Sequence, residues 1–414
     1  MQGKKSFHRY DFAAFAVFAA YALCSLSIPL TIVRMGKDLN FPLTDGGMGQ
    51  GGALHLIRSV AMMVTLLLCG SIAARIGKRF SMGLSMLLMG GGIMLCAFAP
   101  SYWMLWPLLL LAGLGEGICE GIGTPFVQDL HPEAPERYVN ITHSFWSVGI
   151  LVCVLISGGL LTMDVSWRIV LGGGGLLALG AALPFLWRET KGHEYPESRG
   201  KTDAPAILKK TTAILKTPRF WVYCFGMFTG AGAEFCLTFW SAAFLELNFQ
   251  ASAFTAGLGT GAIAAGMFLG RMIFGHIASR TNLPKILFGA SLGTIPVTLC
   301  LSLLRPEFFP ERWMLLAALF FLLFLAGIGI APYWPTLQVH GVTSLPELDS
   351  TMLYIYFSAM GIPGCGFFTW LIGVLGDRYG LNGAFLLIPA SVFVYALVVV
   401  LEYRVFPNRR RLEP

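Results

Sequence analysis

The sequence predicts an all-α integral membrane protein with twelve transmembrane helices arranged as two six-helix halves. Three observations predict this class. The 414 residues are 56% hydrophobic and only 12% charged, whereas charged residues make up roughly 25% of soluble proteins. Apolar runs of about 20 residues, the length that spans a bilayer as a helix, recur along the whole chain. Short sequences from the first half also recur in the second.

The twelve apolar runs define the expected helices. Lipid offers no hydrogen bonds to the backbone, so each run must satisfy its own N–H and C=O groups by forming a helix. The expected spans cover residues 11–33, 46–74, 79–99, 102–128, 138–161, 167–187, 219–245, 252–279, 285–304, 313–338, 350–376 and 383–405.

Lysine and arginine are distributed unevenly between the two sides of these spans. With the amino terminus in the cytoplasm, 21 of the 29 fall on the cytoplasmic side, 6 on the outer side and 2 within spans. The positive-inside rule therefore predicts that both termini are cytoplasmic. This asymmetry accounts for the net charge of +7 without nucleic acid as a partner. The compact loops are typical of a bacterial inner membrane protein.

Composition and motifs also bear on catalysis. All nine cysteines lie in apolar runs, and none has the spacing of metal ligands, so they are interpreted as small buried hydrophobes. No Ser–His–Asp, metal-ligand or nucleotide-binding pattern stands near a membrane surface. We therefore expect no enzyme activity, no metal and no cofactor.

The longest connection divides the chain into two halves of six spans. Residues 188–218 are polar and rich in lysine, which predicts an amino-terminal bundle over 1–187, a cytoplasmic linker and a carboxy-terminal bundle over 219–414. Within the linker, the stretch AILKKTTAILK at 206–216 has two interpretations. It could form a short amphipathic helix on the membrane surface or remain a solvated linker.

Two sequence matches relate the halves. GSIAAR at 70–75 matches GHIASR at 275–280, 205 positions later, and LAGLG at 111–115 matches LAGIG at 325–329. Because the matches fall in corresponding spans, they indicate a duplicated six-helix unit. Internal repeats of this kind are a recurrent plan among transporters.

Two carboxylates lie four residues apart in the fourth span, and on a helix Glu116 and Glu120 share one face. A carboxylate at such depth is costly and by default marks an ion or substrate path. A protonated glutamate bonded to a neighbouring helix is the structural alternative. Because the pKa of a glutamate in low dielectric can rise into the physiological range, both are candidates to bind a coupled proton, Glu120 first.

The second span contains Arg58 near its middle, with His55 one turn away on the same face. An arginine facing lipid would be prohibitively costly, so Arg58 must face the protein interior. Pairing with Glu116 or Glu120 and direct contact with an anionic substrate are equally compatible with the sequence. A hydrogen-bonded histidine at a helix contact is the simpler interpretation of His55.

Three further ionisable residues lie within spans. Glu234 is central in the seventh span. Arg271 is nearer the cytoplasmic end of the eighth, where a gate pair or a side chain extended toward the interface is expected. His143 could relay protons to Glu120 or make a structural hydrogen bond.

Aromatic side chains are candidates for sugar contacts, because a sugar ring offers both C–H surfaces and hydroxyl groups. Each could equally pack in the core or anchor a helix at the lipid interface. The candidates are Trp146, Trp240, Tyr333, Trp334, Tyr354 and Tyr356.

The segment GSIAARIGKR at 70–79 resembles the loop between helices two and three of the major facilitator superfamily. That motif normally carries an aspartate where this chain has Ala74, so the charge latch of the family is in question here. The resemblance implies a major facilitator fold and a gating role for Gly70, Arg75, Gly77, Arg271 and Arg280.

Within the superfamily, several segments resemble the fucose–proton symporter branch. EGIGTPF at 120–126 resembles its fourth-helix Glu and Pro-aromatic pair, and NITHSFWSVG at 140–149 its fifth-helix Asn, His, Phe and Gly pattern. GAGAEFCLTFW at 230–240 resembles its seventh helix, Gly270-Arg271 its eighth and PYWPT at 332–336 its tenth. The first helix has Ser25 and Ser27 where the fucose permease has an aspartate, which points to a different solute.

The resemblance implies a monomeric secondary active transporter in membrane lipid, with protons and a small polar solute as partners. Proton-coupled uptake of a sugar or sugar derivative by alternating access is the leading expectation. A proton-coupled exporter or an organic-anion carrier, with Arg58 binding the anion, is the alternative. The expected solute-binding residues are Arg58, His55, Asn140, His143, Trp146, Glu234, Trp240, Tyr333, Trp334 and Tyr354.

Overall fold

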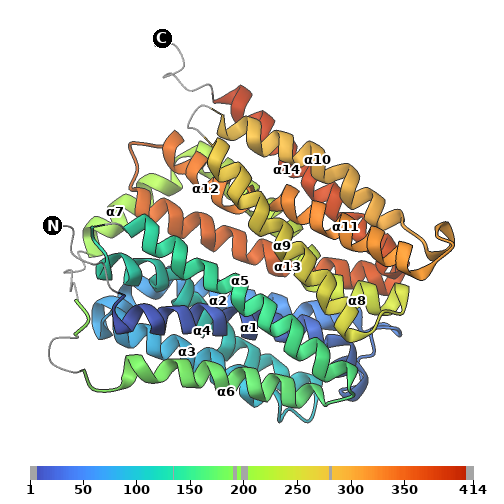
Figure 1. The fold of residues 1–414 in the computed structure, drawn as a ribbon. Helices are drawn as coiled ribbons and strands as arrows, with labels where there is room; N and C mark the ends of the chain where they lie inside the picture. The colour runs from blue at the N-terminus through green and yellow to red at the C-terminus, as the bar shows by residue number, and fades with distance from the viewer. Residues whose placement is uncertain (1–6, 134, 190–193, 197–203, 279–281, 407–414) are drawn as a thin grey trace. The chain divides into compact units, whose positions relative to one another are not determined.

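The structure, a computed structural model, describes residues 7–133, 135–189, 194–196, 204–278 and 282–406. Over these residues the chain forms fourteen α-helices and one 3-10 helix, with no β-strand (Figure 1). Twelve helical segments are long and apolar enough to cross a membrane. The helix α7 is not among them, and α11 and α12 together count as one. The predicted fold class is confirmed.

The helices follow the predicted spans to within a few residues at most ends. The first half contains α1 Arg9–Asp38, α2 Met48–Ile76, α3 Lys78–Cys96, α4 Tyr102–Leu130, α5 Pro135–Thr162 and α6 Trp167–Leu186. The remainder contains α7 Ala204–Leu215, α8 Pro218–Phe249, α9 Ala253–Ile277, α10 Leu283–Leu303, the 3-10 helix η1 Pro306–Phe308, α11 Arg312–Ile330, α12 Tyr333–Ser344, α13 Ser350–Phe385 and α14 Leu387–Val405.

Two spans differ from their predicted form. The tenth is interrupted between α11 and α12, where Pro332 has no N–H to continue the hydrogen-bond ladder. The helix then resumes and ends at Ser344, beyond the predicted boundary. The eleventh span runs almost into the twelfth, because two helices join across a kink at Gly380. Its φ of 72° lies in the left-handed region, which glycine adopts without a steric cost.

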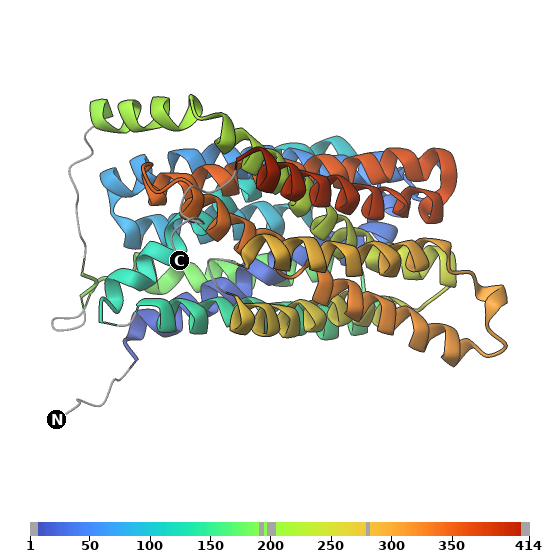
Figure 2. The same cartoon turned by 90° about the horizontal axis from the view of Figure 1, so that it is seen from above.

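Residues 206–215 of the linker segment 206–216 belong to the helix α7. That this helix lies on a membrane surface stays a prediction. Figure 2 shows this light green helix continuing into α8. It is tied to the start of α13 by the Lys210 ammonium, 2.8 Å from Asp349 Oδ2, and by the Thr211 hydroxyl, 2.7 Å from that of Tyr356. Ile214 is fully buried. The helix is therefore anchored by contacts with protein.

The attachment of α7 should depend on pH through Asp349. The Lys210 hydrogen bond, supported by the Met352 N–H, lowers the pKa of this carboxyl below its ordinary value of 3.8. A depressed folded-state pKa stabilises the docked helix above pH 3.8, and the contribution is lost as the pH falls through the folded pKa. We expect a fluorophore on Lys209→Cys to report release of α7 only below about pH 4. Asp349→Asn should remove this step. A pH step that persists in Asp349→Asn would contradict this origin.

Contacts group the chain into two compact units. Unit 1 comprises residues 1–31 and 60–202, and unit 2 comprises residues 32–59 and 203–414. These units do not coincide with the predicted bundles, because the segment 32–59 groups with the second half. The evolutionary division into two six-helix bundles joined by a linker stays a prediction.

The first half of α2 groups with unit 2 because it packs closely on α13. The N–H groups of Met48 and Gly49 donate to the two carboxylate oxygens of Asp377 at 2.8 Å each. A Cβ atom at Gly52 would lie 2.7 Å from the Thr369 carbonyl oxygen. A side chain at this position would therefore separate the two helices.

Glycines of the repeated sequence make equivalent close contacts in the two units. A Cβ atom at Gly115 of α4 would lie 2.4 Å from the Ser85 carbonyl oxygen of α3. Its counterpart Gly329 of α11 would place a Cβ atom 2.1 Å from Thr294 Oγ1 of α10. In each unit the matched glycine thus lets two consecutive spans approach closely, while the duplication itself stays a prediction.

A second equivalence joins the first and sixth spans of each half. The Tyr10 hydroxyl of α1 donates to Glu189 Oε1, just after α6, at 2.8 Å. The Tyr223 hydroxyl of α8 donates to Glu402 Oε1 in α14 at 2.7 Å. Each glutamate also has an arginine beside it, Arg79 in unit 1 and Arg219 in unit 2. A tyrosine–glutamate hydrogen bond thus recurs between the first and last spans of each half, whereas the arginines come from different spans, Arg79 from α3 and Arg219 from α8.

Candidate proton and solute sites

The carboxylate pair of α4 lies inside unit 1. Glu116 is only 3% exposed, and Glu120 is half-buried. A Cβ atom at Gly117 would meet Thr65 Oγ1 of α2 at 2.1 Å, so α2 passes directly against this stretch of α4. The Tyr21 hydroxyl of α1 lies 3.5 Å from Glu120 Oε2. Both carboxyl groups thus belong to the helix-packed interior.

Two predicted residues of α5 lie near the same face of α4. His143 Nε2 is 3.0 Å from the hydroxyl of Thr124, one turn beyond Glu120 on α4. The Trp146 ring packs edge-on against Tyr21 at 4.5 Å. Together with Glu116, these residues form the carboxylate cluster: Tyr21, Glu116, Glu120, Thr124, His143 and Trp146. The side chain of Asn140 lies outside the described residues.

His55 and Arg58 are both buried in unit 2, with exposures of 7% and 2%. The imidazole of His55 stacks on Phe235 of α8, with ring centroids 5.0 Å apart, and lies 5.4 Å from Phe239. Among the residues that the structure describes, nothing accepts from or donates to His55 Nε2. The expectation that Arg58 faces the protein interior agrees with its burial, and its two possible roles stay open.

Glu234 of α8 pairs with Arg271 of α9 across 3.6 Å. The glutamate side chain is 10% exposed and the arginine side chain 47%. The second carboxylate oxygen, Glu234 Oε2, is buried without a hydrogen-bond partner in the described part of the chain. Arg271 therefore makes an ion pair with Glu234, and its gating role stays a prediction. We refer to His55, Arg58, Glu234, Phe235, Phe239 and Arg271 as the α8 cluster.

Two of the predicted aromatic residues are buried in packing contacts, although the Tyr333 hydroxyl has no hydrogen-bond partner among the described residues. Trp240 is completely buried, and its Nε1–H donates to the Thr369 carbonyl at 2.9 Å. Tyr333 packs against Tyr395 at 4.5 Å, and the Tyr395 hydroxyl donates to the Tyr333 carbonyl. These arrangements fit the structural interpretation of both side chains.

The other aromatic candidates of unit 2 are more accessible. Trp334 is half-buried and packs over Gly361, where a Cβ atom would meet its ring at 2.8 Å. Tyr354 is 39% exposed. The Tyr356 hydroxyl instead bonds to Thr211 of α7, so it anchors that helix.

The loop between α2 and α3 turns at Gly77, whose φ of 85° favours glycine. Lys78 directly after it reaches Asp129 of α4 at 2.6 Å, and the same carboxylate accepts from the Tyr195 hydroxyl at 2.8 Å. Ala74 occupies the position where the motif of this loop usually has an aspartate. The carboxylate that contacts the loop comes instead from Asp129 of α4. Of the other predicted gating residues, Gly70 and Arg75 lie at the exposed end of α2, and Arg280 lies outside the described residues.

The sequence of residues 13–365 matches the family profile of the Major Facilitator Superfamily. The chain belongs to this superfamily. The match covers most of the chain, so the resemblance noted on the 70–79 loop is confirmed at superfamily level. Superfamily members are transporters, and the twelve apolar spans make this one an integral membrane protein.

Solved structures of other superfamily transporters share the fold. A bacterial homolog of the human lysosomal transporter Spinster, inward-facing and occupied, has a TM-score of 0.75 and 16% identity, covering 96% of this chain and 97% of that one. A D-xylose–proton symporter has a TM-score of 0.73 and 13% identity, covering 96% of this chain and 98% of that one. The fucose:proton symporter of E. coli has a TM-score of 0.63 and 14% identity, covering 95% of this chain and 98% of that one. Direct comparison with curated protein sequences finds no match.

Two buried ionic clusters of this superfamily member were not predicted. His131 Nε2 lies 2.8 Å from Asp11 Oδ1 in unit 1. In unit 2, Glu402 joins His340 at 3.0 Å and Arg219. The signal was present, since Asp11 and Glu402 are carboxylates at the ends of apolar runs. Within the described residues, no group of three or more His, Cys, Asp or Glu side chains is arranged to hold a metal ion.

Proposed function

We propose that this superfamily member couples the uptake of a small polar solute, a sugar or sugar derivative, to proton entry by alternating access. The observation that carries the proposal is the pair of buried atoms His55 Nε2 and Glu234 Oε2, which have no partner among the described residues. Leaving a buried polar group unsatisfied costs about 1–3 kcal/mol, so native proteins rarely do it. A solute with hydroxyl groups would satisfy both atoms.

The chemistry around these atoms suits a sugar. Phe235 and Phe239 present aromatic surface beside His55, and such surface packs against the C–H face of a sugar ring. Arg58 and Glu234 supply charged hydrogen-bonding groups of opposite sign. Two solved structures that share the fold are described as xylose–proton and fucose–proton symporters, which supports the same class of solute for this chain.

The coupled proton is assigned to Glu120, with Glu116 as its neighbour. Glu120 is half-buried on α4, close enough to Tyr21 for a weak hydrogen bond. His143 lies near it through Thr124, which would suit a proton relay. The protein would act as a monomer in a bacterial inner membrane. Both termini would lie in the cytoplasm, as the distribution of lysine and arginine predicts.

A second candidate function is proton-coupled export, or transport of an organic anion that Arg58 binds. The specific observation that favours it is the burial of the Arg58 guanidinium, which is 2% exposed. A buried cation of this kind could bind a carboxylate of the solute through paired hydrogen bonds. For this function the α8 cluster would recognise the negative charge of the solute more than its hydroxyl groups.

Uptake into proteoliposomes tests the proposal. Reconstituted protein should accumulate a labelled sugar when the outside is more acidic than the inside, and equilibrate it without accumulation when the proton gradient is collapsed. Glu234→Gln should weaken solute binding more than coupling, with Glu133→Gln, a surface carboxylate, as the matched control. Accumulation that ignores the proton gradient would refute proton coupling. Gradient-dependent movement of organic anions alone would establish the second candidate.

A further inference from the structure

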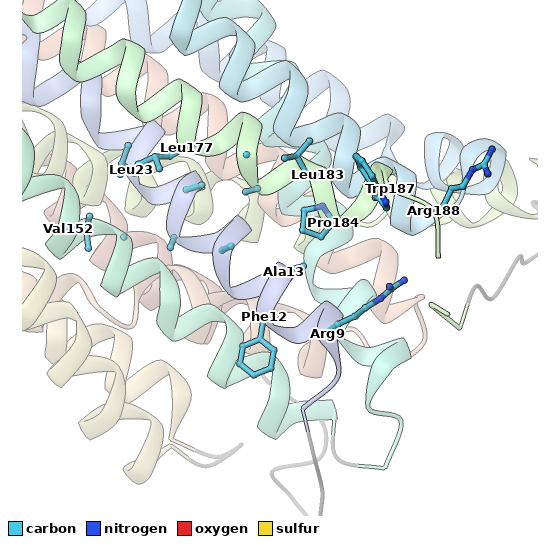
Figure 3. A pocket seen from close by; sticks show the side chains of 16 residues that line it. Arg9, Phe12, Ala13, Leu23, Val152, Leu177, Leu183, Pro184, Trp187 and Arg188 are labelled. Carbon is cyan, nitrogen blue, oxygen red and sulfur yellow. The ribbon is translucent and has the colours of Figure 1, made fainter. Parts of the chain in front are cut away.

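A groove of about 870 Å³ runs along the surface of unit 1 between α1, α5 and α6 (Figure 3). Its wall consists largely of residues with little or no side chain: Ala13, Ala16, Ala20, Gly149, Gly180 and Ala181. Larger apolar residues flank it, and several of them are strongly exposed, including Phe12, Leu177 and Leu183. In a membrane-spanning unit, such exposed apolar residues face lipid chains.

One end of the groove is closed because the helices converge there. Cys24 of α1 lies 3.7 Å from the Gly174 carbonyl of α6, and Cys153 of α5 lies 3.6 Å from the Leu23 carbonyl of α1. Leu23, Val152 and Leu177 line this closed end. The groove is therefore a slot with a floor and an end wall.

The other end is open and basic. Figure 3 shows Arg9 of α1 and Arg188, just after α6, at this mouth, with Trp187 between the apolar wall and Arg188. Arg9 and Leu23 are 14 residues apart on one helix, so the slot is about 21 Å long at 1.5 Å per residue. One leaflet contributes about 15 Å of hydrocarbon. The slot thus extends from the membrane interface to about the bilayer midplane.

The carboxylate of Glu189, near this mouth, does not cancel the positive charge of the mouth. Glu189 accepts from the Tyr195 N–H and the Tyr10 hydroxyl, and Arg79 lies 3.6 Å away. Burial would raise the pKa of Glu189, but these hydrogen bonds, Arg79 and Arg9 outweigh it and hold the pKa below its usual range. Arg9 also donates to the Tyr10 hydroxyl at 3.0 Å. One carboxylate thus lies among three arginines, Arg9, Arg79 and Arg188, so the mouth keeps a positive charge.

We propose that this slot binds one acyl chain of an anionic phospholipid, with Arg9 and Arg188 binding its headgroup. The small-residue wall accommodates a linear chain, and the closed end limits how deep the chain can reach. Guanidinium groups bind phosphate through paired, charge-assisted hydrogen bonds. An anionic lipid is favoured over a zwitterionic one because no cationic headgroup then opposes the two arginines. The slot shares no lining residue with the carboxylate cluster or the α8 cluster.

Native mass spectrometry of the purified, delipidated full chain tests this proposal. Titration with phosphatidylglycerol and with phosphatidylcholine of equal chain length should show one tightly retained phosphatidylglycerol. Arg9→Gln and Arg188→Gln should each weaken its binding roughly fivefold, the effect of one basic residue near an anionic headgroup. Arg404→Gln, an exposed arginine at the end of α14, is the matched control and should bind like the unchanged protein.

A second variant tests the slot itself. Ala16→Trp places a large ring in the exposed wall position of α1 and should abolish retention of either lipid, while an unchanged melting temperature shows that the protein is folded. If this variant does not fold, Ala16→Leu replaces it, with partial loss expected. Equal retention of the two lipids, or retention unaffected by Ala16→Trp or its replacement, overturns the proposal. A dimer that Ala16→Trp converts to a monomer would assign the slot to a second copy and also overturn it.

Discussion

Glu120→Gln should abolish solute accumulation driven by a pH gradient while solute exchange between equal pools continues. Glutamine keeps the size and the hydrogen-bonding capacity of a protonated glutamate but has no proton to release. The variant should therefore still bind solute and change conformation. It should lose the step in which proton release drives net uptake, so the internal concentration should fall from a multiple of the external one to equality. Counterflow and gradient-driven uptake in the same proteoliposomes measure the two quantities separately.

Neighbouring side chains provide the controls for this experiment. Glu116→Gln, one turn away on α4 and more deeply buried, should impair solute binding more than coupling. Tyr21→Phe removes the hydroxyl that lies 3.5 Å from Glu120 and should shift the pH dependence of uptake without abolishing accumulation. Accumulation by Glu120→Gln against a gradient would exclude Glu120 as the coupling group and leave Glu116 or Glu234.

Glu402→Ala should lower the free energy of unfolding by roughly 3–5 kcal/mol, the cost of removing one partner from a buried ion pair. Glu402 is 3% exposed and binds three donors: the Arg219 guanidinium, the Tyr223 hydroxyl at 2.7 Å and His340 Nε2 at 3.0 Å. Its loss removes the carboxylate that pairs with a partly buried guanidinium, whose side chain is 13% exposed. Thermal and denaturant unfolding of the detergent-solubilised protein measures the effect.

Arg404→Ala is the matched control, because it changes an exposed charge in the same last turn of α14 and should alter stability by no more than about 0.5 kcal/mol. The double variant Glu402→Ala with Arg219→Ala should be less destabilised than the sum of the single variants, since the stranded charge is then absent. Strict additivity of the two single variants would show that they do not interact in the folded protein.

The helices could be predicted because lipid forces each apolar run into one, but their interruptions depend on context. Pro125, Pro332 and Pro363 all lie in predicted spans, yet α4 and α13 continue through Pro125 and Pro363. Of these three, only Pro332 separates two helices, α11 and α12, and the proline alone does not indicate which outcome a span will have. Likewise, the sequence does not reveal that Gly380 adopts a left-handed conformation, which kinks α13 and separates its last residues from the rest of the helix.

The depth of the ionisable residues could also be predicted, whereas their neighbours could not. The cost of a charge in lipid required Arg58 and Glu116 to be buried, and both are. The contacts of Tyr21 with Glu120 and of Phe235 with His55 depend on how each helix is rotated about its axis. Twenty apolar residues in a row contain almost no periodic signal for that rotation, so no pattern in the sequence indicated these partners.

The two hydrogen bonds that Asp377 accepts from the first two N–H groups of α2 determine how easily this helix end can detach. Helix N-termini always carry N–H groups without intrahelical partners, and the bond from Gly49 is exposed to solvent. Water can replace the exposed bond when the carboxylate withdraws, and a hydrogen bond to a charged group contributes about 1.5–3 kcal/mol net. The two bonds therefore fix the register of α2 on α13 and also resist separation of this helix end, by an amount that thermal motion can still supply.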